Sequence, residues 1–243
     1  MFYSKIIIIF LNFLDYFQQK NIIKLINKKF LKPIIVFDVG AHYGETIKLF
    51  NKKLNIKKIY SFEASPKNYQ ILQKNISKYT SKKIEIYNYG IGRELSKSYI
   101  NQTLESSSST INELNVNSKY LKKKLKILNI KNKKSFHYKI PIKIITLDYF
   151  IEKNKIKNID LLKIDTEGYE FNVLKGLSKY NQKIKLVYFE HHYDDMIFKN
   201  YKFGDIHQLL KSFGFVMIKK SKMLFRKSFE YVYENQKMIN NLE

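Results

Sequence analysis

An acid and two glycines stand together directly after an apolar run, in the segment Asp38-Val-Gly40-Ala-His42-Tyr-Gly44-Glu-Thr46. A glycine turn behind a strand lets the backbone approach a ligand closely. A dinucleotide site would need the pattern G-x-G-x-x-G, with a glycine where the pyrophosphate meets the backbone, and His42 occupies that place. The segment therefore favours a ligand without phosphate that carries an amino acid end, whose ammonium group Asp38 would hold directly or through water.

A second acid, Glu63, ends the next β-branched run, 25 residues after Asp38. From the end of a neighbouring strand, a carboxylate can accept hydrogen bonds from both hydroxyls of a ribose. Taken alone, Glu63 could equally be an ordinary acid at the start of a helix. Together with the glycine turn, it predicts a cofactor that joins adenosine to an amino acid, which is S-adenosylmethionine.

Three more charged residues, Lys163, Asp165 and Glu167, lie at the end of a later apolar run. Methyl transfer is an in-line displacement in which the protein mainly positions the acceptor and handles one proton. A hydroxyl acceptor is a poor nucleophile at neutral pH and benefits from a general base or a metal ion. Asp165, beside the expected methyl position, is the first candidate for this base. Glu167 and Lys163 are the second candidates.

The segment Glu190-His191-His192-Tyr193-Asp194-Asp195 concentrates side chains that bind metals or move protons. Either His191 or His192 could act as the base, and with neighbouring oxygens could bind a divalent ion. Successive residues on a strand point to opposite faces of a sheet, so only one of the two histidines is expected to face the pocket. A hydrogen-bonded structural pair is the alternative, and no residue is predicted as a metal ligand.

Parallel strands and connecting helices must position these residues, because short β-branched runs alternate with helical periodicity from Lys32 onward. Helices are expected between the strands, with Pro66 in the first turn of one of them. Gly176 and Gly214 are expected near the ends of two others. The predicted strands are 33–38, 58–62, 84–87, 159–165, 184–190, 215–218 and 229–233.

The chain is expected to divide into an amphipathic helical segment, residues 1–31, and one domain, residues 32–243. The N-terminal apolar run is shorter than the roughly 20 residues of a bilayer span. A helix packed on the domain or in a dimer is favoured there over a peripheral membrane helix. Between about residues 93 and 140 the alternation fails at a serine run and a lysine-dense stretch, which predicts an insertion or lid, with solvated linker as the alternative.

The totals agree with one globular domain in a reducing compartment, by default the cytoplasm. The 243 residues are 44% hydrophobic, which is enough for a substantial core, and contain no cysteine for disulfides or thiolate metal sites. A net charge of +24 would ordinarily suggest polyanionic partners. The excess is nearly all lysine spread along the whole chain, so compositional bias is favoured over a nucleic-acid footprint.

With these residues in place, the chain resembles the FkbM family of methyltransferases over roughly residues 34–220. The matching blocks are Phe37–Thr46, Phe62-Glu-Ala-Ser-Pro66, Thr146-Leu-Asp148 and, most specifically, Leu161-Leu-Lys-Ile-Asp-Thr-Glu-Gly-Tyr-Glu170 with Val173-Leu-Lys-Gly176. The resemblance implies a class I Rossmann-like α/β fold. Its sheet would have seven mostly parallel strands, an antiparallel last strand and helices on both faces. It also implies S-adenosylmethionine as cofactor and O-methylation, often of sugars or other secondary metabolites.

Carried over residue by residue, the resemblance implies a cofactor set and an active-site mouth. Lys163, Asp165 and Glu167 would lie at the mouth. The Asn88–Gly92 turn and the serine run follow the family only loosely, so adenine contacts and acceptor choice do not carry over. The implied cofactor set is Asp38, Gly40, His42, Gly44, Thr46, Glu63 and Ala64.

Two other functions compete with O-methylation of a glycan or small-molecule hydroxyl. A nucleic-acid methyltransferase is disfavoured because base N-methylation commonly uses an Asn/Asp-Pro-Pro-Tyr/Phe motif, whereas this chain has Asp165-Thr-Glu-Gly168. No appended nucleic-acid module is visible either. A non-catalytic scaffold would keep the fold and use the N-terminal segment for partners or membrane, because fold alone does not establish activity.

Overall fold

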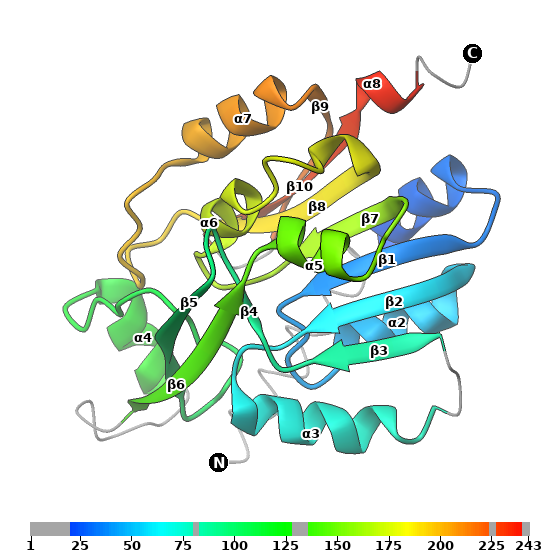
Figure 1. The fold of residues 1–243 in the computed structure, drawn as a ribbon. Coiled ribbons are helices and arrows are strands. Elements are labelled where there is room, and N and C mark those ends of the chain that lie inside the picture. Colours follow the sequence, from blue (N-terminus) through cyan, green and yellow to red (C-terminus); the bar gives the residue numbers. More distant parts are fainter. Residues whose placement is uncertain (1–19, 80–82, 128–135, 224–226, 240–243) are drawn as a thin grey trace.

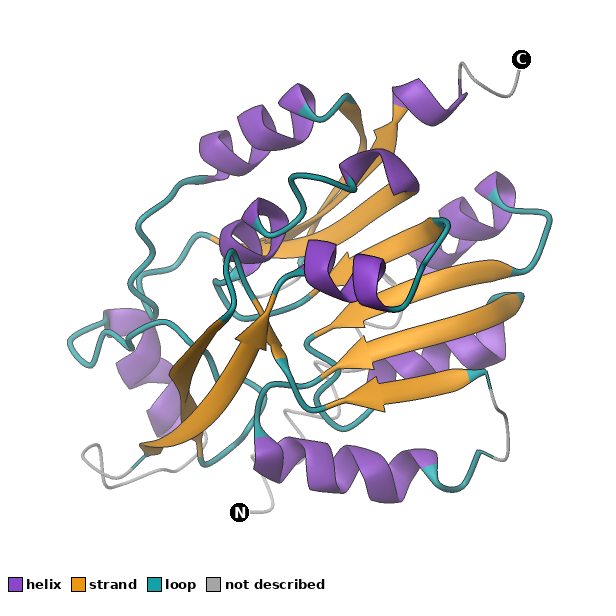
Figure 2. Cartoon of the chain, in the orientation of Figure 1, coloured by secondary structure: helices purple, strands orange, loops and turns teal. Residues whose placement is uncertain are grey.

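A seven-stranded sheet forms the centre of the computed structural model, which describes residues 20–79, 83–127, 136–223 and 227–239 (Figure 1, Figure 2). The strand order is β3-β2-β1-β7-β8-β10-β9. The strands are β1 (Ile34–Val39), β2 (Ile56–Phe62), β3 (Ile84–Tyr87), β7 (Ile159–Ile164), β8 (Ile184–His192), β9 (Phe215–Lys222) and β10 (Ser228–Asn235).

The strand directions confirm the predicted class of sheet. β1 pairs in parallel with β2 and β7, β2 with β3, and β7 with β8. β10 runs antiparallel to both of its neighbours, β8 and β9. This is the predicted mostly parallel seven-stranded sheet with an antiparallel last strand. The fifth predicted strand continues through His192, two residues beyond its predicted end.

Each face of the sheet carries its own apolar core, because buried strands send alternate side chains to opposite faces. One core includes side chains of α5 (Leu147–Lys153), α6 (Glu170–Lys175) and α7 (Phe203–Ser212). The other includes side chains of α2 (Glu45–Lys53), α3 (Pro66–Ile76) and the helix at residues 20–29. The remaining helices are α4 (Lys119–Ile127), the 3-10 turn η1 (Asn181–Lys183) and α8 (Gln236–Ile239).

Two helices, α3 and α5, begin at residues whose side chains cap them. Ser65 caps α3 by accepting a hydrogen bond from the Asn68 amide, and Pro66 stands in the first turn. Thr146 caps α5 in the same way through the Tyr149 amide. These caps fix where the loops at the carboxyl ends of the strands turn into helices.

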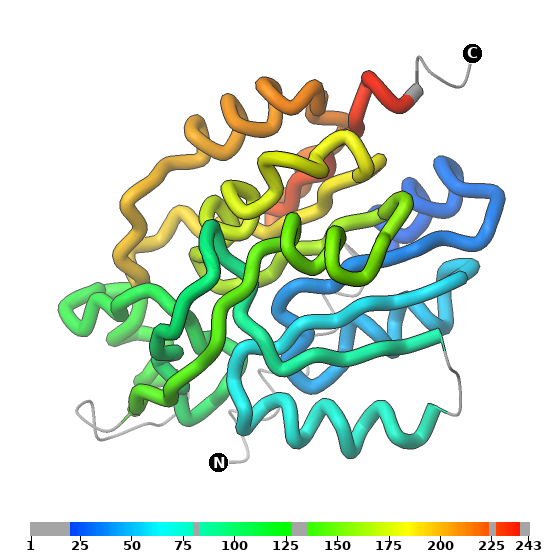
Figure 3. Tube along the Cα trace, viewed as in Figure 1, coloured from blue at the N-terminus to red at the C-terminus, as the bar shows by residue number. Residues whose placement is uncertain are grey.

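The segment predicted as an insertion, together with the residues that flank it, forms a small second sheet and a helix beside the main sheet. Its strand order is β4-β6-β5, with β4 (Gly90–Ile91), β5 (Ser96–Thr103) and β6 (His137–Ile145). α4 is amphipathic, burying Leu121 and Leu125 while Lys122, Lys123 and Lys126 are exposed. The segment after β8 also packs there, with Met196 and Ile197 in the apolar cluster of α4 (Figure 3). Part of the lysine-dense stretch, residues 128–135, lies outside the described residues.

Residues 20–29 form a helix that packs on the domain, with Ile22, Ile23 and Ile26 buried in the core of α2 and α3. The rest of the predicted N-terminal segment, residues 1–19, lies outside the described residues, and the boundary at residue 31 stays a prediction. Within the described part of the chain, no helix is long and apolar enough to span a bilayer.

Candidate active site

The turn after β1 requires backbone that ordinary residues avoid. Gly40 has φ 88°, His42 has φ 48° and Gly44, which precedes the first residue of α2, has φ 94°. A Cβ atom on Gly40 would lie 1.8 Å from the carbonyl oxygen of Asp165. Only glycine therefore lets this turn reach the end of β7.

Glu63 is held at the end of β2 by the same turn. One carboxylate oxygen accepts the His42 amide at 2.8 Å, and the other accepts the Ser65 amide at 2.9 Å. Burial raises the pKa of Glu63 to about 7, and the two backbone hydrogen bonds oppose that rise. Asn88 donates to the carbonyl oxygens of Glu63 and Ala64, which fixes the loop that carries the acid. Ala64 itself packs on the apolar cluster of the small sheet.

Lys163 of β7 is a buried cation between two acids. Asp38 is its register partner on β1, and Asp38 Oδ1 lies 3.5 Å from Lys163 Nζ. Asp165 Oδ2 lies 3.3 Å from the same nitrogen, which also donates to Thr46 Oγ1 at 2.9 Å. Burial lowers the pKa of Lys163, but Asp165 and Asp38 outweigh burial and raise it. Lys163 therefore stays protonated and forms an ion pair with each of the two acids.

Glu167 lies on the turn between β7 and α6, in the left-handed region at φ 49° and followed by Gly168 at φ 90°. Its carboxylate is mostly buried, with Oε2 3.5 Å from His192 Nε2. Burial raises the pKa of Glu167 to about 7, although His192 and Lys124 act to lower it. A buried carboxyl group that titrates near neutrality can accept and release a proton under ordinary conditions.

His191 and His192 have different neighbours, as strand alternation predicts. His191 packs among the rings of Tyr193, Tyr201 and Phe203. Burial and the nearby Lys199 lower its pKa to about 3, so the ring is neutral.

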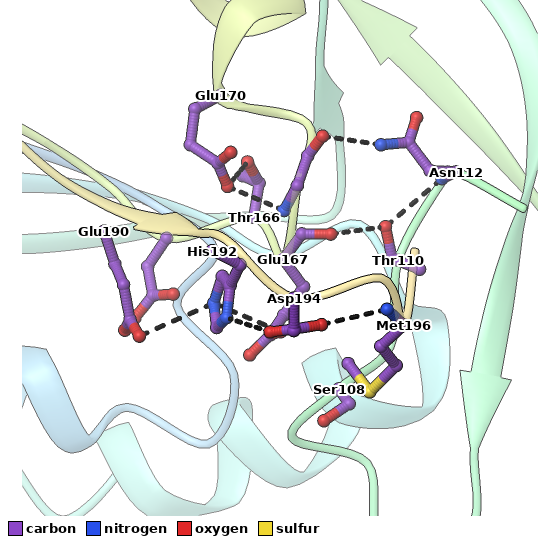
Figure 4. Close-up of polar contacts among 12 residues, drawn as sticks. Ser108, Thr110, Asn112, Thr166, Glu167, Glu170, Glu190, His192, Asp194 and Met196 are labelled. Atoms are coloured by element: carbon purple, nitrogen blue, oxygen red, sulfur yellow. Dashed lines mark hydrogen bonds and ion pairs between the residues drawn. The ribbon is translucent and has the colours of Figure 1, made fainter. Parts of the chain in front are cut away.

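His192 instead lies in a group of three acids, Glu167, Glu190 and Asp194, each 3.5 Å from one of its ring nitrogens (Figure 4). Burial alone would lower the pKa of His192, but these carboxylates raise it to about 10. The ring is therefore an imidazolium at neutral pH. Of the two histidines, only His192 lies against Glu167.

The segment predicted as an insertion contacts the turn after β1 and the turn that carries Glu167. The residues that make these contacts were not among the predicted site residues. Ser106, from the serine run, forms a 2.7 Å hydrogen bond with His42 Nε2. Thr110 donates to the Glu167 carbonyl oxygen at 2.8 Å, and Asn112 donates to the Gly168 carbonyl oxygen at 2.5 Å (Figure 4). The serine run was the one sequence feature that could have indicated these contacts, because it is a polar stretch inside the predicted insertion or lid.

The methyltransferase FkbM domain model matches residues 38–217, which include every part of this site. The chain belongs to the FkbM methyltransferase family. The match begins at Asp38 and runs through both loops that carry acids, the insertion and the end of β8.

Two curated relatives of this FkbM chain are methyltransferases. One is the hexuronic acid methyltransferase AglP of Haloferax volcanii, 24% identical over 174 residues that cover 72% of this chain and 62% of the relative. The other is Methyltransferase 1 of Beauveria bassiana, 25% identical over 150 residues, 58% of this chain and 57% of the relative. The chain thus spans about three fifths of the length of these relatives.

Solved structures share the fold of this FkbM chain. The methyltransferase FkbM of Methylobacillus flagellatus has a TM-score of 0.53 at 15% identity, covering 83% of this chain and 44% of that one. The magnesium protoporphyrin IX methyltransferase of Synechocystis, with bound S-adenosylmethionine, has a TM-score of 0.51 at 10% identity, covering 93% and 79%. The structural likeness establishes the class I methyltransferase fold, and at identities this low it does not indicate the acceptor.

The residues of the FkbM site fit the cofactor of class I methyltransferases. Gly40 brings backbone close to the strand ends, and the buried Glu63 offers carboxylate oxygens at the position that suits ribose hydroxyls. Asp38 Oδ1 is buried 3.5 Å from Lys163 Nζ and makes no hydrogen bond, which leaves it able to accept one from an ammonium group or a water molecule. Among the described residues, no group of three or more acids and histidines has a metal-binding arrangement.

Proposed function

We propose that this chain transfers a methyl group from S-adenosylmethionine to a hydroxyl group of a sugar or glycan, with Glu167 as the general base. The observation that supports the base most directly is the Glu167 carboxyl group, buried 3.5 Å from the His192 imidazolium with a pKa of about 7. A general base works best when its pKa is close to the working pH. A cytoplasmic location and a small-molecule or glycan partner are part of the proposal.

On the cofactor side, each residue has a separate task in the proposal. Gly40 brings the backbone of the turn close to the ligand, Glu63 accepts bonds from the ribose hydroxyls, and Asp38 receives the ammonium group directly or through water. When bound, S-adenosylmethionine supplies an electrophilic methyl group on a sulfonium. The amides of His42 and Ser65 already orient both oxygens of Glu63, so the acid needs no rearrangement to bind.

On the acceptor side, the candidates for the base differ in their surroundings. Lys163 is protonated between Asp38 and Asp165 and has no free electron pair at neutral pH. Asp165 is paired with that cation at 3.3 Å. His192 is an imidazolium, and His191 packs among aromatic rings. Glu167 remains as the group that can take a hydroxyl proton while His192 stabilises its carboxylate form.

A sugar is the acceptor class favoured by the relatives, because AglP is a hexuronic acid methyltransferase. The large excess of lysine, with 45 Lys and Arg against 21 Asp and Glu, suits an acidic glycan. A hexuronic acid offers both hydroxyl and carboxyl oxygens. The proposal concerns the hydroxyl, since a carboxylate acceptor is already ionised and has no need of Glu167.

The test is methyl transfer from radiolabelled S-adenosylmethionine to glucuronic acid oligosaccharides, with neutral oligosaccharides and transfer RNA as competing acceptors. The proposal expects label on a glycan as an ether that survives alkali, and a fall in kcat of about a hundredfold or more in Glu167→Gln. Label lost on mild alkaline hydrolysis would mean a methyl ester. Label on RNA alone would contradict the sugar acceptor.

A further inference from the structure

The turn that carries Glu167 is held in place by contacts from two sides. On its own side, Glu170 Oε1 accepts the Gly168 amide at 2.8 Å and the Thr166 hydroxyl at 3.1 Å. Tyr201 donates to the Gly168 carbonyl oxygen at 3.0 Å. These bonds fix Gly168 and the start of α6, but none of them reaches the carbonyl group of Glu167.

The Glu167 carbonyl is held from the insertion. Thr110 Oγ1 donates to it at 2.8 Å, and this hydroxyl also accepts the Asn112 amide at 3.2 Å. Because the backbone N–H of Asn112 can only donate, the hydroxyl proton of Thr110 remains available for the Glu167 carbonyl oxygen. Serine could make both bonds in the same way, whereas valine, with nearly the same shape, could make neither.

Thr110 is itself rigidly placed. It is 1% exposed, and its backbone exchanges two hydrogen bonds with Asn101 of β5, at 2.8 and 3.2 Å. The Asn101 side chain donates to the Asn112 carbonyl at 2.8 Å. The small sheet therefore presents Thr110 to the Glu167 turn on a fixed support, which is what precise placement of a reacting group requires.

Left-handed backbone at a residue other than glycine is strained, at a cost of about 1–3 kcal/mol, and persists only where neighbours hold it. Without the bond from Thr110, Glu167 can relax away from φ 49°. Its carboxylate would then leave the buried position against His192. The charged groups that face this carboxylate are Lys124 of α4, Asp165 of its own turn, Glu190 and His192 of β8, and Asp194 and Lys199 of the following segment.

We propose that Thr110 is a positioning residue for methyl transfer: its hydroxyl fixes the Glu167 peptide and so keeps the Glu167 carboxylate buried beside His192. The role rests on the proposed function of Glu167. The small sheet and its loop then contribute to catalysis, because the Thr110 side chain determines where the Glu167 carboxylate lies.

The experiment follows the titration of Glu167 in the full chain by ¹³C NMR of labelled glutamate carboxyl groups, with the resonance assigned through Glu167→Gln. Wild type should titrate near pH 7, because burial raises this pKa. In Thr110→Val, we expect the pKa to move toward the ordinary glutamate value of 4.5 as the carboxylate reaches water. Thr110→Ser should restore the wild-type titration.

A matched control is Ser109→Ala, which removes the bond to the Ser106 carbonyl at 2.7 Å and the bond from the Thr103 amide at 3.1 Å, but no bond to the Glu167 turn. It should leave the titration unchanged. Asn112→Ala, which removes one of the two side-chain hydrogen bonds to the Gly168 carbonyl and leaves that from Tyr201, should shift the titration in the same direction as Thr110→Val. It serves as the second variant if Thr110→Val folds poorly.

Turnover is then measured with the oligosaccharide acceptor that wild type methylates. Thr110→Val should lower kcat about tenfold or more with little change in KM for S-adenosylmethionine, since misplacing a reacting group by about 1 Å can cost up to a hundredfold. An unshifted Glu167 titration in folded Thr110→Val would overturn the positioning role. Full activity of Glu167→Gln would instead overturn the base, and with it the catalytic meaning of Thr110.

Discussion

The turn after β1 touches the end of β7 at one point: a Cβ atom added to Gly40 would lie 1.8 Å from the Asp165 carbonyl oxygen. The cofactor turn and the strand that carries the acceptor-side acids are thus in backbone contact. The Gly40 position has no room for a side chain, and its φ of 88° is unfavourable for any residue that carries one. In the proposed function, the relative placement of cofactor and acceptor therefore depends on this contact.

Gly40→Ala should lower the free energy of unfolding by about 1–3 kcal/mol from backbone strain alone, with a further cost from the clash with Asp165. It should also abolish cofactor binding. Denaturant unfolding and calorimetry measure the two effects.

The matched control is Gly204→Ala in the first turn of α7, where no atom lies within 4 Å of the added Cβ. That change should stabilise by about 0.5–1 kcal/mol. Equal effects of the two substitutions would contradict the account.

Lys163→Met should destabilise the protein by about 3–5 kcal/mol, because it leaves Asp38 and Asp165 without their buried cation. The loss should be smaller near pH 5 than at pH 7, since the pKa of Asp38 is already raised by burial and would rise further without Lys163. Thermal unfolding at the two pH values measures this. The double variant Lys163→Met with Asp38→Asn should recover part of the stability. Lys179→Met, which breaks an exposed ion pair, should have little effect.

The free energy of unfolding should fall between about pH 6.5 and pH 10, because the unfolded chain loses the His192 proton at the lower pH and the folded protein at the higher one. The folded-state pKa of His192 is raised from 6.5 to about 10, so its stabilising contribution is fully present below pH 6.5 and is lost as pH rises through 10. His192→Gln should show a shallower decline over this window, and the comparison is cleanest above the Glu167 pKa of about 7. Denaturant titrations at closely spaced pH values make the comparison. Parallel curves for the two proteins would mean that His192 is not the imidazolium described above.

The parts of the fold that could be predicted from the sequence are those that depend on neighbouring residues. Each β-branched run, the Gly40 turn and each acid at a strand end is recognised from a few consecutive residues, and the antiparallel last strand follows from the family resemblance. The alternation that separates His191 from His192 is likewise a property of one strand.

The contacts of the insertion could not be predicted because they join distant segments. Thr110 and Glu167 are 57 residues apart in the chain, and His42 and Ser106 are 64 apart. No periodicity in β5 or α4 indicates which polar side chain will meet which carbonyl. The pairing of Asp38 with Lys163 similarly needs the register between β1 and β7, which the sequence alone does not reveal.

The most direct test of the cofactor site is titration calorimetry of the purified chain with S-adenosylmethionine and S-adenosylhomocysteine, alongside Glu63→Ala. The Glu63 carboxylate is oriented by the amides of His42 and Ser65 and is the group assigned to the ribose hydroxyls. The account predicts micromolar binding that weakens at least tenfold in Glu63→Ala, on the order of the 1.4 kcal/mol expected from losing a hydrogen bond to a charged group. Folded wild-type protein that binds neither ligand would contradict it and favour a scaffold with a methyltransferase fold.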